Sequence, residues 1–174
     1  RHQGDGREDG YSLAEAGRSA GVAEVPRSNS AEVVAMNEVL MQALVAILAG
    51  ASAVSTLVSD RVGGDTEETD LTLPAVTMRT LATTTPARDL VSRGGIRRSM
   101  VELAADATSL VGSVQLLEAC LAALNPYEAG PANIPVSAGT ARLASIHLDD
   151  VTQSPPVRER SYRQTAILIV AFYE

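Results

Sequence analysis

The sequence has no tryptophan and no lysine, and its only aromatic residues are one Phe and four Tyr. A hydrophobic core must therefore be aliphatic, built from Val, Leu, Ile and Ala. So few rings leave few platforms on which the bases of single-stranded nucleic acid could stack. Because arginine replaces lysine throughout, ion pairs to carboxylates are made by guanidinium groups, which can donate two parallel hydrogen bonds.

The chain is acidic, with a formal net charge of −7, and it has one cysteine. DNA binding without sequence preference depends on neutralising phosphates, so we expect DNA to pass by this protein without being bound. Cys120 alone excludes a disulfide within the chain. The apolar run from Val39 to Leu48 is shorter than the roughly 20 residues that span a bilayer, and no signal-peptide pattern is present. We expect a soluble protein that is made in the cytoplasm and makes no membrane contact.

Residues 1–35 differ in composition from the rest of the chain. They are rich in Gly, Ser and charge and have almost no apolar periodicity, so they cannot offset the entropy of ordering alone. We predict a flexible N-terminal arm or an extension upstream of the functional start, since Met36 directly precedes the first periodic segment. Residues 36–174 are predicted to form one domain.

Apolar spacing in the first part of this domain predicts two helical segments and a hairpin. Leu40, Leu44, Ile47 and Leu48 form one helical stripe that Gly50 can end, and a short second turn follows through Val58. Polar, turn-rich residues 63–74 are typical of a loop. Two alternating segments, residues 75–84 and 99–105, predict strands joined by a long hairpin tip.

The second part begins with a helix and ends with two strands. Thr108 or Ser109 can cap the helix, and its predicted buried stripe is Leu110, Val114, Leu117, Leu121 and Leu124. A Pro- and Gly-rich linker is predicted over 126–139, and strands over 141–149 and 164–174. The predicted fold is α+β, an antiparallel four-stranded sheet with two main helices on one face, in the order α-β-β-α-β-β.

The last strand, "QTAILIVAFYE", is apolar on both faces. Ala166, Leu168, Val170 and Phe172 share one face, and the other face carries Ile167, Ile169, Ala171 and Tyr173. Helices on one side of the sheet would cover only one of these faces. The second face therefore needs cover from another part of this chain or from another chain.

Catalytic motifs are lacking. His147 lies near Asp149 and Asp150, but no third ligand of the expected type is apparent, so a surface histidine is favoured over a metal site. Cys120 lies among Leu and Ala in a predicted helix, where a thiol acts as a small hydrophobic group. The glycines of "SRGGIRRS" (residues 92–99) lack the spacing of a phosphate loop. We expect no enzyme, no metal and no cofactor.

Charged residues supply the candidate interface, although a solvated surface explains each cluster slightly better. Arginines gather at the predicted hairpin tip and carboxylates in the 63–74 loop, and the opposite signs could meet between subunits. Two further arginines precede the last strand, whose second face completes the set. The candidates are Arg88, Arg93, Arg97, Arg98, Asp65, Glu67, Glu68, Asp70, Arg158, Arg160, Ile167, Ile169 and Tyr173.

From Met36 to Glu174, the order of these segments resembles that of a known family. An amphipathic opening helix, "MNEVLMQALVAIL", precedes "LVSDRVGGD" and "LPAVTMRTL"; "RRSMVELAADATS" then runs into a helix, and "ARLASIHLDD" and "RSYRQTAILIVAFYE" close the chain. This pattern resembles the tail-completion proteins (tail terminators, head–tail joining proteins) of long-tailed bacteriophages, prophages and gene transfer agents. The sequence departs from the family's pattern at Gly63 and around Ala104, where aromatic residues are expected.

The resemblance implies a structural virion protein at the junction of tail and neck. Such proteins form a ring, usually a hexamer, that caps the head-proximal end of the tail tube, stops its polymerisation and presents a joining surface to the neck. The implied partners are further copies of the chain, the major tail-tube protein and the neck connectors, with DNA passing through the ring. In such a ring, a neighbouring subunit would cover part of the second apolar face of the last strand. The alternatives are another neck connector, such as a head-completion or stopper protein, and an α+β ligand-binding domain.

Overall fold

The computed structural model describes residues 30–64, 72–84, 95–137, 139–154 and 161–173. Its helices are α1 (Ser30–Gly50), α2 (Ser52–Val58) and α3 (Leu110–Leu124), and α3 continues into the 3-10 turn η2 (Asn125–Tyr127). The strands are β1 (Val62–Gly64), β2 (Ala75–Thr84), β3 (Ile96–Ala107), β4 (Ala132–Val136), β5 (Gly139–Ser154) and β6 (Tyr162–Tyr173).

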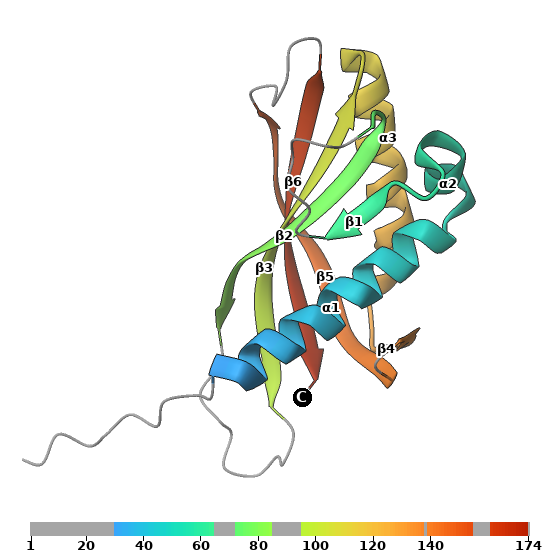
Figure 1. Cartoon of the computed structure of the whole chain (residues 1–174). Coiled ribbons are helices and arrows are strands. Elements are labelled where there is room, and N and C mark those ends of the chain that lie inside the picture. Colours follow the sequence, from blue (N-terminus) through green and yellow to red (C-terminus); the bar gives the residue numbers. More distant parts are fainter. Residues whose placement is uncertain (1–29, 65–71, 85–94, 138, 155–160, 174) are drawn as a thin grey trace, which may run out of the picture.

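The strands form one six-stranded sheet in the order β1-β2-β3-β6-β5-β4. β1 runs parallel to β2, and every other neighbouring pair is antiparallel. The sheet is strongly twisted and curves like half of a barrel, with the helices on its concave side (Figure 1). α1 starts at Ser30, within the segment predicted as an arm, and crosses the concave side of the sheet.

The predicted four-stranded antiparallel sheet and the predicted order α-β-β-α-β-β are wrong, because two short edge strands were assigned to a loop and a linker. β1 has three residues, two of them glycine, and β4 contains Pro135. Both compositions weaken a strand's own propensity but are tolerated at the edge of a sheet, where one side needs no ladder partner. β1 is a strand because it pairs with β2, and β4 is a strand because it pairs with β5; no local sequence pattern predicts either one.

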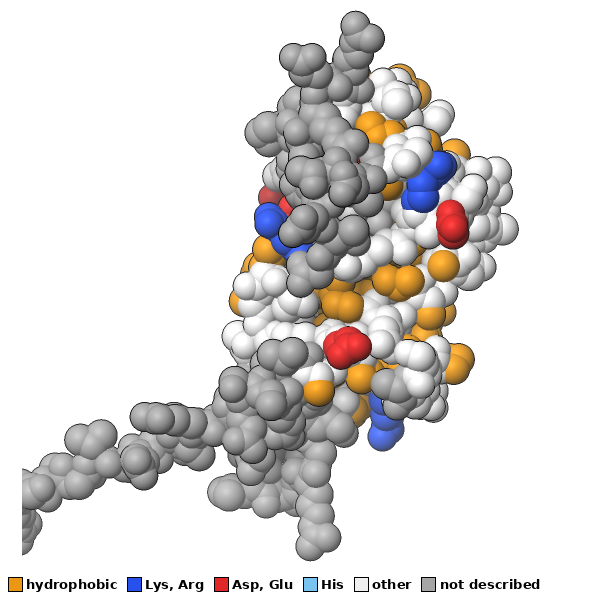
Figure 2. Space-filling model, viewed as in Figure 1, with side chains coloured by type: hydrophobic (Ala, Val, Ile, Leu, Met, Phe, Trp, Pro, Cys, Tyr) orange, Lys and Arg blue, Asp and Glu red, His pale blue; other side chains and the backbone are white. Residues whose placement is uncertain are grey.

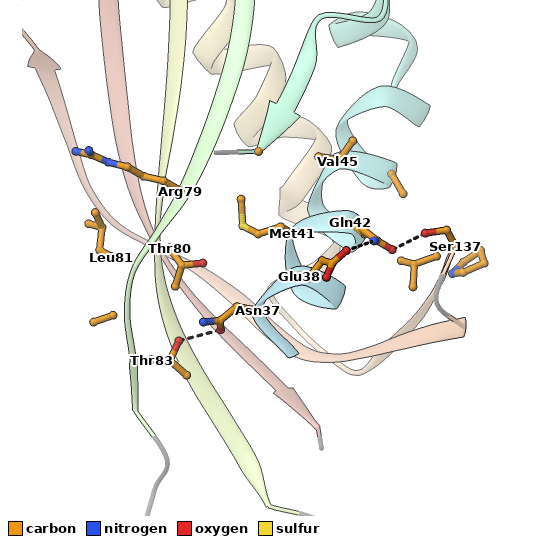
Figure 3. A pocket seen from close by; sticks show the side chains of 15 residues that line it. Asn37, Glu38, Met41, Gln42, Val45, Arg79, Thr80, Leu81, Thr83 and Ser137 are labelled. Atoms are coloured by element: carbon orange, nitrogen blue, oxygen red, sulfur yellow. Dashed lines mark hydrogen bonds between the residues drawn. The ribbon is translucent and has the colours of Figure 1, made fainter. Parts of the chain in front are cut away.

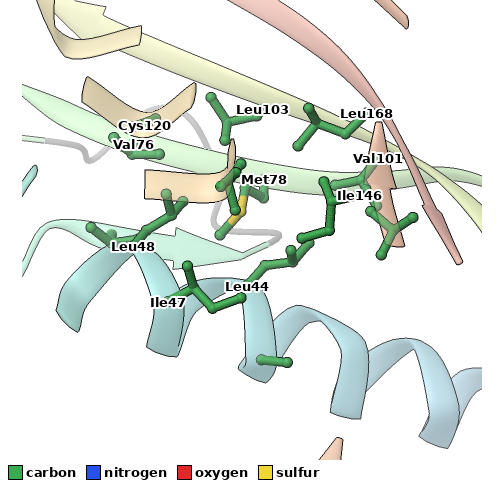
Figure 4. Packing of buried hydrophobic residues seen from close by; sticks show 14 of the residues in the cluster. Leu44, Ile47, Leu48, Val76, Met78, Val101, Leu103, Cys120, Ile146 and Leu168 are labelled. Carbon is green, nitrogen blue, oxygen red and sulfur yellow. The ribbon is translucent and has the colours of Figure 1, made fainter. Parts of the chain in front are cut away.

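The core lies between the concave side of the sheet and the helices (Figure 4). The predicted α1 stripe is confirmed, since Leu40, Leu44, Ile47 and Leu48 are all buried. They pack with β-strand residues such as Leu103 and Leu168. The N-cap of α3 is Ser109, whose hydroxyl accepts a hydrogen bond from the Gly112 amide at 3.1 Å.

The predicted stripe of α3 is only partly right. Leu110 and Val114 are 42% and 37% exposed, while Ser113, Leu116 and Cys120 are buried beside Leu117 and Leu124. Leucines stand on two adjoining stripes of this helix, so spacing alone does not choose between them. The packing interpretation of Cys120 is confirmed, and burial raises the pKa of its thiol to about 12.

Candidate subunit interface

The convex side of the sheet, opposite the helices, is here called the open face. The β3–β6 register puts Ile167 beside Glu102 and Ile169 beside Met100 on this face. Met100 is 36% exposed, and Ile167, Ile169 and Tyr173 are half-buried. The second apolar face of the last strand is therefore only partly covered within the single chain, which leaves an aliphatic surface available to a partner.

Two cross-strand ion pairs on the open face differ sharply in exposure. Arg163 donates from Nε and Nη2 to Oδ1 and Oδ2 of Asp106, both at 2.8 Å, and the two side chains are 7% and 4% exposed. Arg79 Nε donates to Glu102 Oε2 at 2.6 Å, with the Arg79 side chain 58% exposed. The first pair fixes β3 against β6 inside the structure, whereas the guanidinium of the second reaches solvent.

Tyr173 marks the other end of the open face. The guanidinium carbon of Arg142, on β5, lies 4.3 Å from the centre of its ring. A cation above an aromatic face is attracted by the ring quadrupole, and this holds β5 against the end of β6.

The structure separates two arginines that the sequence predicted together. Arg97 and Arg98 lie in β3 and not at a hairpin tip, so that prediction is wrong for both. Arg98 is exposed on the open face opposite Ala171, whereas Arg97 lies on the helix side opposite Phe172 and is 5% exposed. Successive strand residues point to opposite faces, so only Arg98 faces outward here. The remaining charged candidates lie outside the described residues: Arg88, Arg93, Asp65, Glu67, Glu68, Asp70, Arg158 and Arg160.

His147 and Asp150 are exposed on β5, opposite Ile169 and Ile167 on the open face. Asp149 falls where the β5–β6 register shifts between Leu148 and Asp150. Within the described residues, no group of three or more His, Cys, Asp and Glu side chains could hold a metal ion. No single helix of that same part could span a membrane by length and composition, although α1 and α2 pass that test as a pair bent by 88°.

A groove of about 1260 Å³ lies between α1 and the second half of β2, and sequence analysis did not find it. Met41 and Val45 stand one turn apart on the outer side of α1 and line it together with Leu81 of β2. Figure 3 shows Met41 extending from α1 toward β2. Figure 2 shows apolar side chains exposed in a band across this side of the molecule. A second apolar stripe on α1 was the available signal, but the position of β2 beside that stripe could not be predicted from the sequence.

Side-chain hydrogen bonds fix the walls of this groove. Thr83 donates to Asn37 Oδ1 at 3.0 Å, which ties β2 to the first half of α1. Ser137, next to the end of β4, donates to Gln42 Oε1 at 2.7 Å. Both bonds join α1 to the segments that line the groove with it (Figure 3).

No family model and no curated protein matches the sequence. Among solved structures, the fold is similar to that of one chain in "Virion of native gene transfer agent (GTA) particle", with a TM-score of 0.56 and 15% sequence identity. The match covers 80% of this chain and 98% of the other. At this identity the likeness establishes a shared fold, and it extends over nearly all of the other chain.

Proposed function

We propose that the protein is a structural virion component that caps the head-proximal end of a phage or gene-transfer-agent tail tube. In this proposal it forms a ring, ends the polymerisation of the tube and presents the joining surface to the neck. The observation that carries the proposal is the fold, which matches nearly the whole of a chain from a gene transfer agent virion. The order of sequence segments from Met36 onward supports the same role.

The surface of the single chain suits an assembly component. A closed ring needs two different patches on each subunit, one for each neighbour. The apolar groove beside α1 offers one such patch, and the exposed Leu148 and Val151 of β5 offer another. Met100, Ile167 and Ile169 on the open face then remain available to the tube or the neck. The net charge of −7 supports a ring through which DNA passes without being held, because acidic subunits repel phosphate.

Deleting the gene and imaging the particles by electron microscopy tests this function. We expect tail tubes of uncontrolled length and heads without attached tails, both restored by the wild-type gene supplied in trans. Detached tails of normal length would instead assign the protein to another connector of the neck. Normal particles in the deletion strain would refute a role in tail completion altogether.

A further inference from the structure

Apart from the outer edges of the short terminal strands β1 and β4, two longer strand segments have no strand partner on one side among the described residues. β1 pairs only with Val76–Met78 of β2, which leaves Arg79–Thr84 unpaired on that side. β4 pairs with β5 only up to Leu143, which leaves the rest of β5 unpaired on its outer side. Unpaired amides and carbonyls at a sheet edge are a template for another strand. These segments are called the β2 edge (residues 79–84) and the β5 edge (residues 145–154).

The two edges fit each other in direction. β2 is antiparallel to β3, β3 to β6, and β6 to β5, so β2 and β5 run in opposite directions within one sheet. If the β5 edge of one copy lay beside the β2 edge of the next, the sheet would continue as an antiparallel pair. The same chain therefore carries both halves of a head-to-tail contact.

The edges also fit each other in apolar surface. Leu148 and Val151 of the β5 edge are each 45% exposed and lie opposite Leu168 and Ala166, on the helix side of the sheet. Side chains keep their side when a sheet is extended by another strand. On a neighbouring β2 edge, Leu148 and Val151 would therefore face α1 and enter the groove lined by Met41 and Val45.

Charge supports the same pairing on the opposite side of the strands. Asp150 of the β5 edge is exposed on the open face, opposite Ile167. Arg79 of the β2 edge projects on the open face as well, and its side chain is 58% exposed. The contact therefore brings a carboxylate of one copy to the side where its neighbour presents a guanidinium group.

We propose that successive copies of this chain join by strand addition, with the β5 edge of one paired to the β2 edge of the next and Leu148 and Val151 seated beside α1. This inference rests on the proposed ring and specifies its interface. Across the ladder, residues 145–150 of the β5 edge are level with the β2 edge, whereas residues 151–154 are level with the half of β2 that pairs with β1. Val151 therefore reaches the β2 edge of the next copy only when neighbours are staggered along the strands. When every contact repeats this stagger, the subunits can close into a ring in which the strands are tilted relative to the ring axis.

Cysteine cross-linking tests the pairing directly. Ala82 of the β2 edge lies on the open face with Asp150 and Thr152 of the β5 edge, and all three are exposed. Under oxidising conditions, Ala82→Cys protein mixed with either Asp150→Cys or Thr152→Cys protein should lose its monomer band to a covalent dimer. Each variant alone should not cross-link, because the contact joins two different edges. A variant with both cysteines in one chain should form a ladder of covalent multimers.

Matched controls test which face of the β5 edge lies on the same side as Ala82. Ala82→Cys mixed with Val151→Cys should not cross-link, because Val151 lies on the helix side and a strand sends alternate residues to opposite faces. Native Cys120 is buried and does not interfere, so wild-type protein should remain uncross-linked. Self-cross-linking of Ala82→Cys alone would show two identical edges meeting and would overturn the proposal. Cross-linking of Ala82→Cys to Ser19→Cys in place of the β5 cysteines would show that the N-terminal segment lies along the β2 edge and would also overturn the proposal.

A charge at the apolar contact gives an independent test. Val151→Lys should keep the unfolding midpoint of the wild type but lose the ring, measured by light scattering and particle images with and without isolated tail tubes. Gln115→Lys adds the same charge at an exposed position of α3 and should assemble normally. Rings formed by Val151→Lys would overturn the strand pairing and leave the proposed function standing. Normal particles from the deletion strain would refute the proposed function, whether or not the β2 and β5 edges pair.

Discussion

Two ion pairs on one face of the sheet share a directly opposed cross-strand position and differ in burial. Asp106–Arg163 and Arg79–Glu102 each join residues that are direct register partners on neighbouring strands. Asp106→Ala leaves the Arg163 guanidinium in a site where the side chain is only 7% exposed, and it removes two hydrogen bonds of 2.8 Å. Breaking a buried pair in this way costs about 3–5 kcal/mol, since the buried guanidinium loses its carboxylate without becoming exposed to water.

Urea unfolding measures this loss. With a slope of about 2 kcal/mol per molar urea, Asp106→Ala should lower the unfolding midpoint by about 2 M. Glu102→Ala is the matched control, because Arg79 stays hydrated and an exposed pair contributes about 0–1 kcal/mol. A double variant, Asp106→Leu with Arg163→Met, should lose less than Asp106→Ala, since it leaves no buried charge. Equal midpoint shifts for Asp106→Ala and Glu102→Ala would refute the argument from burial.

Three further predictions concern α3 and β3. Ser109→Ala removes the oxygen that accepts from the Gly112 amide and should cost about 1 kcal/mol in thermal unfolding; an unchanged midpoint would show that the cap contributes nothing. Cys120 should resist thiol reagents at mildly alkaline pH until the protein unfolds, because burial raises its pKa to about 12 and keeps the thiol protonated; rapid labelling of folded protein would contradict the packing of α3. Arg98→Glu should leave the monomer's stability unchanged within about 0.5 kcal/mol and weaken assembly, whereas Arg97→Glu should destabilise the monomer, since a carboxylate would replace a side chain that is 5% exposed. Equal unfolding midpoints for these two variants would contradict their placement on opposite faces.

Features that depend on neighbours in the sequence could be predicted from the sequence alone. The stripe of α1 follows from apolar residues at helical spacing, and Ser109 lies directly before the apolar run that it caps. β2 was predicted with its observed limits, because β-branched residues and alternation are concentrated there. The two apolar faces of β6 are likewise a property of alternation, so the need for cover on both sides could be stated without coordinates.

Features that depend on distant parts of the chain were decided by the tertiary structure. β1 and β4 are strands because β2 and β5 offer edges to pair with, and their own residues favour turns. α3 buries Leu116 and Cys120 in place of Leu110 and Val114 because the sheet and α1 meet that side of the helix. The groove beside α1 and the two unpaired edges exist only where segments far apart in the sequence lie together. Spacing along the chain determines which side chains share a face of a helix or strand. Which element packs against that face depends on long-range strand pairing, which a local sequence pattern does not predict.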